Sequence, residues 1–467
     1  MPNVAHGKSD LQGLHAYCDP NHRHHEGDRF GRLFPNLPPL FNDPRKLADL
    51  GKPGGVMDDG NDNTRTTTVA VGQVFFGQFV DHDVTLDVSS SLDTVNNPES
   101  IENVRSPTLD LDCVYGAGPE AMPFMFHADG VFKGVKLITG ADAGTGPHAA
   151  QDLPRIGEVA VIGDFRNDEN RVISQIQLAM IRFHNAMVDR AKAEHPDLAG
   201  KELYEEARRL CMWHYQWALV HDFLALICGE GVVNRVLTQG RKFYRPHVAF
   251  IPVEFSVAAY RFGHSMVPMK IQVQTGEAPV SLFGDVLGRG FESIKDPRAA
   301  VDLHELFETR EGRQVERTGR MDTKLSSQLL ALPTNVDPDQ RSLATRNLVR
   351  GQAFLLPSGE EIARCLGRPD AEIEQISDAS GLNGGTPLWF YILKEAELIG
   401  RENLDGTRLP GEGLGPVGAT IVAETIIGLI ELDPRSWLSN DSSWTPISRD
   451  GDGTENETVS ARLDGER

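Results

Sequence analysis

Hydrophobic residues recur at helical spacing along most of the chain, whereas alternating strand patterns are scarce. One clear case is residues 168–192, where Ile173, Ile176 and Met180 share one side of a helix. The pattern predicts helices over residues 68–86, 168–192, 200–237, 254–268, 324–332, 358–366 and 418–431, and short strands at 248–253 and 269–273. We therefore expect a mainly α fold with little β structure.

Composition divides the chain into three parts. Residues 1–60 are rich in Pro, Gly, Asn and His, and they predict an irregular N-terminal arm that lies on the main body. Residues 61–440 show no internal repeat or domain boundary and are expected to form one catalytic domain, with an extended loop at 101–120. Residues 441–467 are polar and predict a disordered tail. His22, His24 and His25 in the arm fit either a metal cluster or a solvated loop, and the lack of partner spacing favours the loop.

Charge and length narrow the function classes. The chain has 467 residues, 40% of them hydrophobic, which is enough to bury a large core. A formal net charge of −21 repels phosphate backbones, so we expect no nucleic-acid partner. The N-terminal residues lack the apolar core of a signal peptide. The sequence has no run of eighteen apolar residues, so it predicts no membrane span. These features predict a cytoplasmic protein, or one exported by a route without a signal peptide.

The cysteines are few and widely spaced, and no CxxC pair is present. This spacing favours separate free thiols over a disulfide framework. The five cysteines are Cys18, Cys113, Cys211, Cys228 and Cys365.

The most informative stretch is Gly77–Asp83, which reads GQFVDHD. On a helix Gln78 and His82 are four residues apart and share one face. Consecutive residues project about 100° apart, so Asp81, His82 and Asp83 point in three directions. Either this is the solvated edge of an amphipathic helix, or the three groups are buried and need partners. Composition alone favours the solvated edge.

This stretch resembles the distal signature of the animal-type haem peroxidases, members of the peroxidase–cyclooxygenase superfamily. The resemblance implies a fold in which haem is held between helices. It implies that His82 is the base that takes a proton from hydrogen peroxide, and that Gln78 lines the same pocket. It also implies an ester between Asp81 and a haem methyl group, and a calcium ion bound by Asp83.

A second segment, Ser106 to Asp112, reads SPTLDLD. Alternate residues of an extended segment point the same way, so the side chains of Ser106, Thr108, Asp110 and Asp112 could converge. In isolation a turn with exposed aspartates remains open. The family resemblance implies a calcium loop, because hard oxygen ligands suit this ion. The family usually has serine where this chain has Asp112, which makes that ligand a departure.

A third segment, Gly163 to Glu169, resembles the family's Gly-Asp-x-Arg-x-x-Glu stretch. The resemblance implies that Arg166 lies beside His82 and stabilises developing charge, and that Glu169 forms a second haem ester. Taken alone, the two residues equally fit a surface arginine and an acid at a helix start. Asn170 stands where some members have a methionine bonded to a haem vinyl group, so the resemblance does not support chloride oxidation.

The fourth and fifth segments resemble the proximal side of the family site. The resemblance implies that His264, in AYRFGHS, ligates the haem iron and that Asn347 holds its other ring nitrogen. Arg261 and Arg350 would face the haem propionates. The residues alone did not single out His264 among fifteen histidines, several of them on predicted helices.

Together the five segments, spread over residues 61–440, predict a haem peroxidase. Its partners would be hydrogen peroxide and a small reductant, namely bromide, iodide, thiocyanate or a phenol, oxidised through a ferryl intermediate. The expected cofactors are haem b, with possible ester links through Asp81 and Glu169, and Ca²⁺. The alternative is a fatty-acid dioxygenase of the cyclooxygenase type, which has a tyrosine three residues before the proximal histidine, where this chain has Arg261. A non-catalytic haem carrier is disfavoured because His82, Arg166 and Gln78 are all present.

Overall fold

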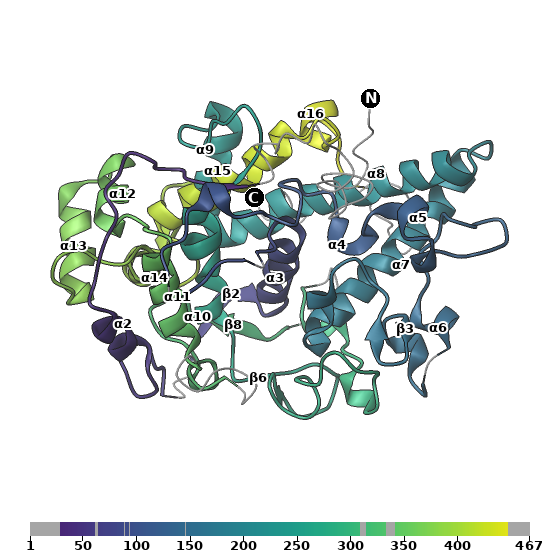
Figure 1. The fold of residues 1–467 in the computed structure, drawn as a ribbon, viewed down its shortest axis with the longest axis horizontal. Helices are drawn as coiled ribbons and strands as arrows, with labels where there is room; N and C mark the ends of the chain where they lie inside the picture. The colour runs from purple at the N-terminus through teal and green to yellow at the C-terminus, as the bar shows by residue number, and fades with distance from the viewer. Residues whose placement is uncertain are drawn as a thin grey trace.

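The structure is a computed structural model that describes residues 29–60, 64–87, 89–92, 94–144, 146–308, 314–332 and 341–446. Helices dominate this part of the chain, and the long helical stretch that begins with α8 runs along the length of the molecule (Figure 1). The predicted mainly α class is confirmed. The helices are α2 (Pro44–Gly51), α3 (Gly72–Val84), α4 (Asp112–Tyr115), α5 (Gly118–Ala121), α6 (Gly140–Ala143), α7 (Arg171–Glu194), α8 (Gly200–Ala218), α9 (Glu230–Gln239), α10 (Gly263–Met266), α11 (Leu343–Ala353), α12 (Gly359–Cys365), α13 (Asp370–Ser380), α14 (Leu388–Leu398), α15 (Pro416–Leu432) and α16 (Trp437–Asn440).

The strands are short and form only two-stranded sheets in the described part of the chain. β1 and β5 pair in parallel, and the other four pairs are antiparallel. The strands are β1 (Phe30–Gly31), β2 (Arg65–Ala70), β3 (Arg155–Ile156), β4 (Val159–Ala160), β5 (Ile251–Pro252), β6 (Lys270–Ile271), β7 (Val280–Ser281), β8 (Arg317–Gly319), β9 (Arg401–Glu402) and β10 (Arg408–Leu409). The predicted strands at 248–253 and 269–273 are reduced to β5 and β6.

Four predicted helical ranges are confirmed with boundary changes of three residues or fewer: those of α7, α12, α15 and the stretch Gly200–Gln239. α12 and α15 fall within a residue or two of the predicted ranges. The stretch Gly200–Gln239 is helical throughout, because a π-helical segment at Leu219–Gly229 joins α8 to α9. This stretch is long and apolar enough to cross a membrane, but 61% of its most apolar window is buried inside the protein, which is also the pattern of a core helix.

Four local predictions are wrong. The segment predicted to be helical from residue 68 begins instead as strand β2, whose RTTTVA sequence is rich in β-branched residues, and α3 starts only at Gly72. Residues 254–268 contain a π-helical segment, a 3₁₀ turn and α10 rather than one regular helix. Residues 324–332 form only a 3₁₀ turn at Ser327–Leu330. The predicted loop at 101–120 includes α4 and part of α5.

The described part of the N-terminal arm is less irregular than predicted. Its helix α2 begins with a capped turn, in which the Asp43 side chain accepts a hydrogen bond from the backbone N–H of Arg45 and Pro44 occupies the first helical position. α2 packs against α11. The arm histidines, Cys18 and the tail beyond residue 446 lie outside the described residues.

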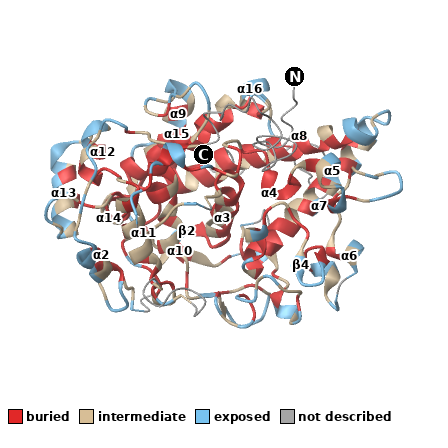
Figure 2. Cartoon of the chain, in the orientation of Figure 1, coloured by how far each residue is buried: buried red, intermediate tan, exposed pale blue. Residues whose placement is uncertain are grey.

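The core lies between α3, α7, α8 and α15, and the buried positions concentrate there (Figure 2). Nearly the whole of α15 is buried, which explains its continuous apolar sequence. α3 packs against α7 on one side and contacts α4 and α10. The segments that carry the predicted site residues therefore meet around α3.

Candidate functional site

His82 and its neighbour Asp83 are buried on α3, with 5% and 0% of their surface exposed. The interpretation of this stretch as a solvated helix edge is therefore wrong for both residues. Nδ1 of His82 lies 2.7 Å from Oδ1 of Asn167. Burial, followed by the positive charge of Arg166, lowers the pKa of His82 to about 4. The imidazole is thus neutral at physiological pH, as a proton acceptor must be.

Arg166 lies beside His82, on the 3₁₀ turn Phe165–Asp168 that precedes α7. Its Nη2 donates to the backbone carbonyl of His82 at 3.0 Å and to Oδ2 of Asp164 at 2.7 Å. Burial opposes ionisation of Asp164, but hydrogen bonds and ion pairs with Arg166 and Arg105 lower its pKa to about 2. The Asp164 carboxylate therefore fixes the guanidinium next to the distal histidine.

Gln78 and Glu169 also meet on this side of α3. The amide of Gln78, which shares a helix face with His82, donates to the Glu169 carboxylate. Burial raises the pKa of Glu169 to about 7. Asp81 lies one residue before His82, and its Oδ1 accepts a hydrogen bond from the Thr85 hydroxyl at 3.0 Å.

His264, on α10, is the second histidine of the site. Its Nδ1 lies 2.7 Å from Nδ2 of Asn347 on α11, while Oδ1 of that amide accepts a hydrogen bond from Arg261 at 3.2 Å. Burial and the charge of Arg261 lower the pKa of His264 to about 3. Among the described residues, none forms a hydrogen bond with Nε2 of either His82 or His264.

The distal and proximal segments are neighbours in space. α3 contacts α10, and the carboxylate of Asp81 interacts electrostatically with Arg261, three residues before His264. Arg350, one turn beyond Asn347 on α11, donates to Ser90 Oγ at 2.8 Å. Burial lowers the pKa of Arg261 to about 10, and repulsion by the positive charge of Arg350 contributes to this lowering. Two close guanidiniums suit a ligand with two carboxylates.

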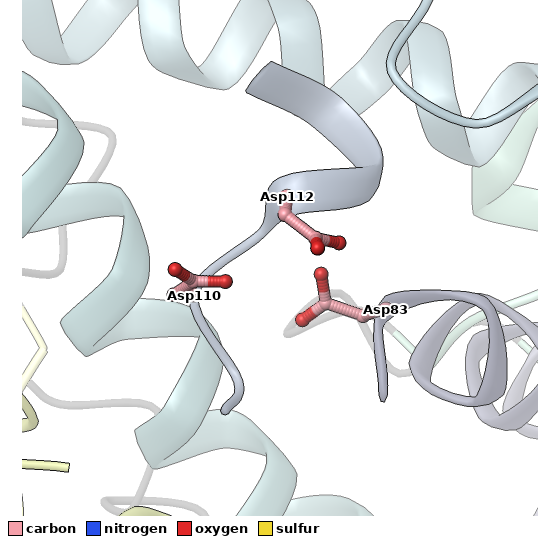
Figure 3. Close-up of side chains that lie close together, drawn as sticks. All are labelled: Asp83, Asp110 and Asp112. Carbon is pink, nitrogen blue, oxygen red and sulfur yellow. The ribbon is translucent and has the colours of Figure 1, made fainter. Parts of the chain in front are cut away.

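Three buried aspartates converge on the other side of α3. Carboxylate oxygens of Asp83, Asp110 and Asp112 lie within 4.8 Å of one another (Figure 3). Ser106 Oγ donates to Asp110 at 3.3 Å, and Thr108 Oγ1 donates to Ser106 Oγ at 2.9 Å. The five predicted ligand side chains are therefore gathered in one place, and the alternative of exposed aspartates is wrong.

The convergence does not come from an extended segment, as the sequence pattern suggested. Leu111 adopts φ 62°, in the left-handed region that leucine rarely occupies, and so turns the chain between Asp110 and Asp112. The backbone N–H of Leu111 then donates to Asp83 at 3.2 Å, which ties the loop to α3. A strained backbone at this position is consistent with a binding loop.

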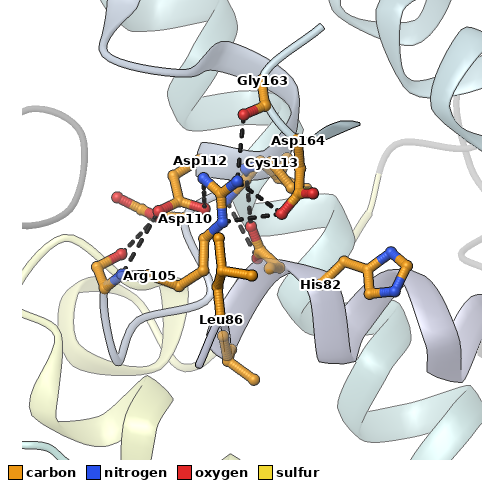
Figure 4. Close-up of polar contacts among 12 residues, drawn as sticks. His82, Leu86, Arg105, Asp110, Asp112, Cys113, Gly163 and Asp164 are labelled. Carbon is orange, nitrogen blue, oxygen red and sulfur yellow. Dashed lines mark hydrogen bonds and ion pairs between the residues drawn. The ribbon is translucent and has the colours of Figure 1, made fainter. Parts of the chain in front are cut away.

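The charges around the acidic cluster are only partly balanced. Arg105 pairs with Asp164 at 2.6 Å and approaches Asp112 at 3.5 Å (Figure 4). Arg208 and Arg435 both pair with Asp110, at 3.1 Å and 3.2 Å. Burial and the two neighbouring carboxylates raise the pKa of Asp83 well above its usual value. Burial raises the pKa of Asp112 to about 7 in spite of Arg105. This donor set fits a cation of hard type.

Sequence reasoning missed four residues that hold the site together. Asn167 contacts His82, and Gln177 on α7 accepts a hydrogen bond from Asn167 at 2.8 Å. Asp164 and Arg105 link the distal arginine to the acidic cluster. Asn167 and Asp164 lie inside the quoted GDFRNDE stretch, so a polar residue on each side of Arg166 was the available signal.

The other sequence interpretation that the structure tests concerns cysteine. Cys113, Cys211 and Cys228 are buried free thiols, and Cys365 is an exposed free thiol. The prediction of separate thiols is confirmed for these four residues.

In this mainly helical fold, buried His82 and partly buried His264 lie on packed helices, each contacted at Nδ1 by an asparagine side chain. An imidazole held through one nitrogen can ligate a haem iron through the other. A model of the animal haem peroxidase family matches residues 91–378, more than half of the chain, and the chain therefore belongs to that family. The matched range begins after α3, so Gln78, Asp81 and His82 lie just outside it, whereas Arg166 and Glu169 lie within it.

Curated relatives agree with this assignment. The chain is 23% identical to human dual oxidase 2 over 379 residues, which are 74% of this chain and 23% of that protein. It is 24% identical to rat thyroid peroxidase over 388 residues, 76% of this chain and 40% of that protein. The chain thus spans less than half the length of these relatives.

Solved structures show the same fold at low identity. Peroxidase A from Dictyostelium discoideum aligns with a TM-score of 0.58 and 16% identity, covering 88% of this chain and 89% of that one. A fatty acid alpha-dioxygenase from Arabidopsis thaliana aligns with a TM-score of 0.60 and 15% identity, covering 89% and 74% of the two chains.

Proposed function

We propose that this chain is a haem-dependent peroxidase that binds haem between His82 and His264 and uses hydrogen peroxide to oxidise a small reductant. The observation that carries the proposal is the pair of imidazoles on adjacent segments, His82 buried and His264 partly buried. Each has Nδ1 at 2.7 Å from an asparagine side chain, and no hydrogen bond to Nε2 of either ring occurs among the described residues. Haem, when bound, supplies the redox centre that takes two oxidising equivalents from peroxide and passes them on to the reductant.

On the distal side, the proposed roles follow from charge and geometry. Neutral His82 takes a proton from hydrogen peroxide through Nε2 and returns it to the departing oxygen, which leaves as water. The guanidinium of Arg166, fixed by Asp164, stabilises negative charge on that oxygen. Gln78 orients water or a halide beside the histidine.

On the proximal side, His264 is the proposed iron ligand. Ligation through Nε2 requires the proton on Nδ1 and an oxygen facing it. In the structure the amide oxygen of Asn347 instead accepts a hydrogen bond from Arg261. A haem propionate that draws Arg261 away would free Asn347 to turn its oxygen toward His264, which is the orientation that ligation needs. The residues therefore fit the group, with one amide rotation coupled to haem binding.

The finer proposals concern links and metal. Asp81 and Glu169 are the carboxylates that would form ester bonds to haem. Asp83, Ser106, Thr108, Asp110 and Asp112 would hold calcium, which would join the loop to α3 and so hold His82 in place. Bromide, iodide, thiocyanate and phenols are the proposed reductants.

A second candidate is a fatty-acid dioxygenase, which the likeness to plant alpha-dioxygenases favours. The structure has Arg261 three residues before His264, where that class places its tyrosine. The nearby Tyr260 is buried, and a Cβ atom built at Gly77 on α3 would lie 3.9 Å from its hydroxyl oxygen. Oxygen uptake with linoleate in the absence of peroxide would favour the dioxygenase.

The experiment is a stopped-flow measurement of peroxide reduction by the haem-loaded protein, with bromide and a phenol as reductants. His82→Gln should retain haem and slow the peroxide reaction by about 10²–10⁴-fold, the usual contribution of a general base. His304→Gln, a change at an exposed histidine, is the control and should react as the wild type does. Equal rates for His82→Gln and the wild type would reject the proposal.

A further inference from the structure

Among the described residues, Asn167 makes the one hydrogen bond of the His82 ring, and neither sequence nor family comparison assigns it a role. The residue is 0% exposed and sits on the 3₁₀ turn directly after Arg166. Its Oδ1 lies 2.7 Å from Nδ1 of His82, on the side of the ring away from Nε2. Figure 4 shows the His82 ring directed away from the acidic cluster.

A second buried amide sets the direction of this hydrogen bond. Gln177, also 0% exposed, accepts a hydrogen bond from Nδ2 of Asn167 at 2.8 Å. With its amide nitrogen committed to Gln177, Asn167 presents a carbonyl oxygen to His82, and a carbonyl oxygen only accepts. A neutral imidazole has one N–H, and here that proton must lie on Nδ1.

We propose that Asn167, oriented by Gln177, is a positioning residue that fixes the ring proton of His82 on Nδ1 and so keeps Nε2 free to accept a proton from peroxide. The inference rests on the proposed function, because it matters to catalysis only if His82 acts as a base. Without Asn167 the ring would populate both neutral tautomers, and the one with a proton on Nε2 cannot act as the base.

The test combines kinetics with nuclear magnetic resonance on the full haem-loaded chain. Asn167→Leu should lower the plateau rate, whereas Asn167→Asp, which keeps an oxygen acceptor opposite Nδ1, should retain a higher rate. Asn185→Leu is the matched control, because Asn185 also makes two hydrogen bonds, to the Leu137 backbone, but lies away from His82. The control should lower stability without lowering the plateau rate.

The second readout does not depend on turnover. In protein labelled with ¹⁵N-histidine, in its diamagnetic carbon monoxide complex, the His82 signals should show a protonated Nδ1 and an unprotonated Nε2. Their assignment comes from the spectrum of His82→Gln. A wild-type ring protonated on Nε2, or a plateau rate that is the same in Asn167→Leu as in the wild type, would overturn the inference.

The two proposals fail in different ways. If the wild type reacts with peroxide but Asn167→Leu reacts equally fast, the positioning role is wrong and the peroxidase stands. If the wild type binds no haem or leaves peroxide unchanged, the proposed function is wrong, and the positioning role falls with it. If Asn167→Leu does not fold, the nearly isosteric Asn167→Asp and the wild-type spectrum still decide the question.

Discussion

Calcium dependence offers a quantitative test of the acidic cluster. Without a cation, burial and like charges hold protons on Asp83 and Asp112 in the folded state that the unfolded chain releases. Raising the pKa of Asp112 alone from 3.8 to about 7 destabilises the fold by about 4 kcal/mol at neutral pH. The sign follows from proton binding, since a folded state that binds more protons loses stability as pH rises between those two values.

A bound Ca²⁺ ion removes this loss, because it replaces the protons. In chelator we therefore expect the melting temperature to fall between pH 5 and pH 8, and with calcium we expect it to stay nearly constant. Calcium at one hundred times its dissociation constant adds about 2.7 kcal/mol. At about 2 °C per kcal/mol, that corresponds to a shift of about 5 °C at pH 8.

The assay is thermal unfolding with and without calcium at both pH values, for the wild type and Asp83→Asn. The variant loses one buried carboxylate, so it should be more stable than the wild type in chelator at pH 8 and should respond little to calcium. Asp285→Asn makes the same change of charge at a side chain that is 93% exposed, and it should keep the full response. A calcium response that is equal in wild type and Asp83→Asn, or larger at pH 5 than at pH 8, would refute the reasoning.

Three further predictions concern the haem side of α3 and the loop that faces it. If Asp81 and Glu169 form esters, acid–butanone should leave haem on the wild type after turnover with peroxide, and should extract it from the Asp81→Asn, Glu169→Gln double variant. Arg166→Leu should slow the peroxide reaction about a hundredfold while haem binding persists, as seen by stopped-flow absorbance. Gly163→Ala places a Cβ atom 2.6 Å from the carbonyl oxygens of Asp112 and Cys113, and should lower the free energy of unfolding in urea by about 1–3 kcal/mol.

The sequence was sufficient for the fold class and for most of the residues that the structure brings together. Long periodic segments such as α7 and α15 were readable because their apolar faces repeat over many turns. Short elements could not be predicted in this way. The π-helical and 3₁₀ turns before His264 leave no periodic signal, and β2 was absorbed into the predicted helix because Val69 and Ala70 fit both patterns.

The residues of the site also divide into those that the sequence identified and those that it did not. His82, Arg166, His264 and Asn347 were identified through resemblance, and the structure brings them together in two pairs: Arg166 donates to the His82 carbonyl, and the Asn347 amide contacts the His264 ring. Asn167 was passed over because its function depends on a partner 85 residues away, which sequence spacing does not reveal. The left-handed turn at Leu111 was equally invisible, since leucine carries no preference for that conformation.

The measurement that most directly tests the account is a haemin titration of the purified chain followed in the Soret region. We predict a shifted Soret band that saturates at one haemin per chain, is retained in His82→Gln, and is lost or weakened in His264→Ala. A chain that stays colourless with haemin, or a His264→Ala variant that binds haemin with unchanged affinity and spectrum, would contradict the central claim that haem is held between these two histidines.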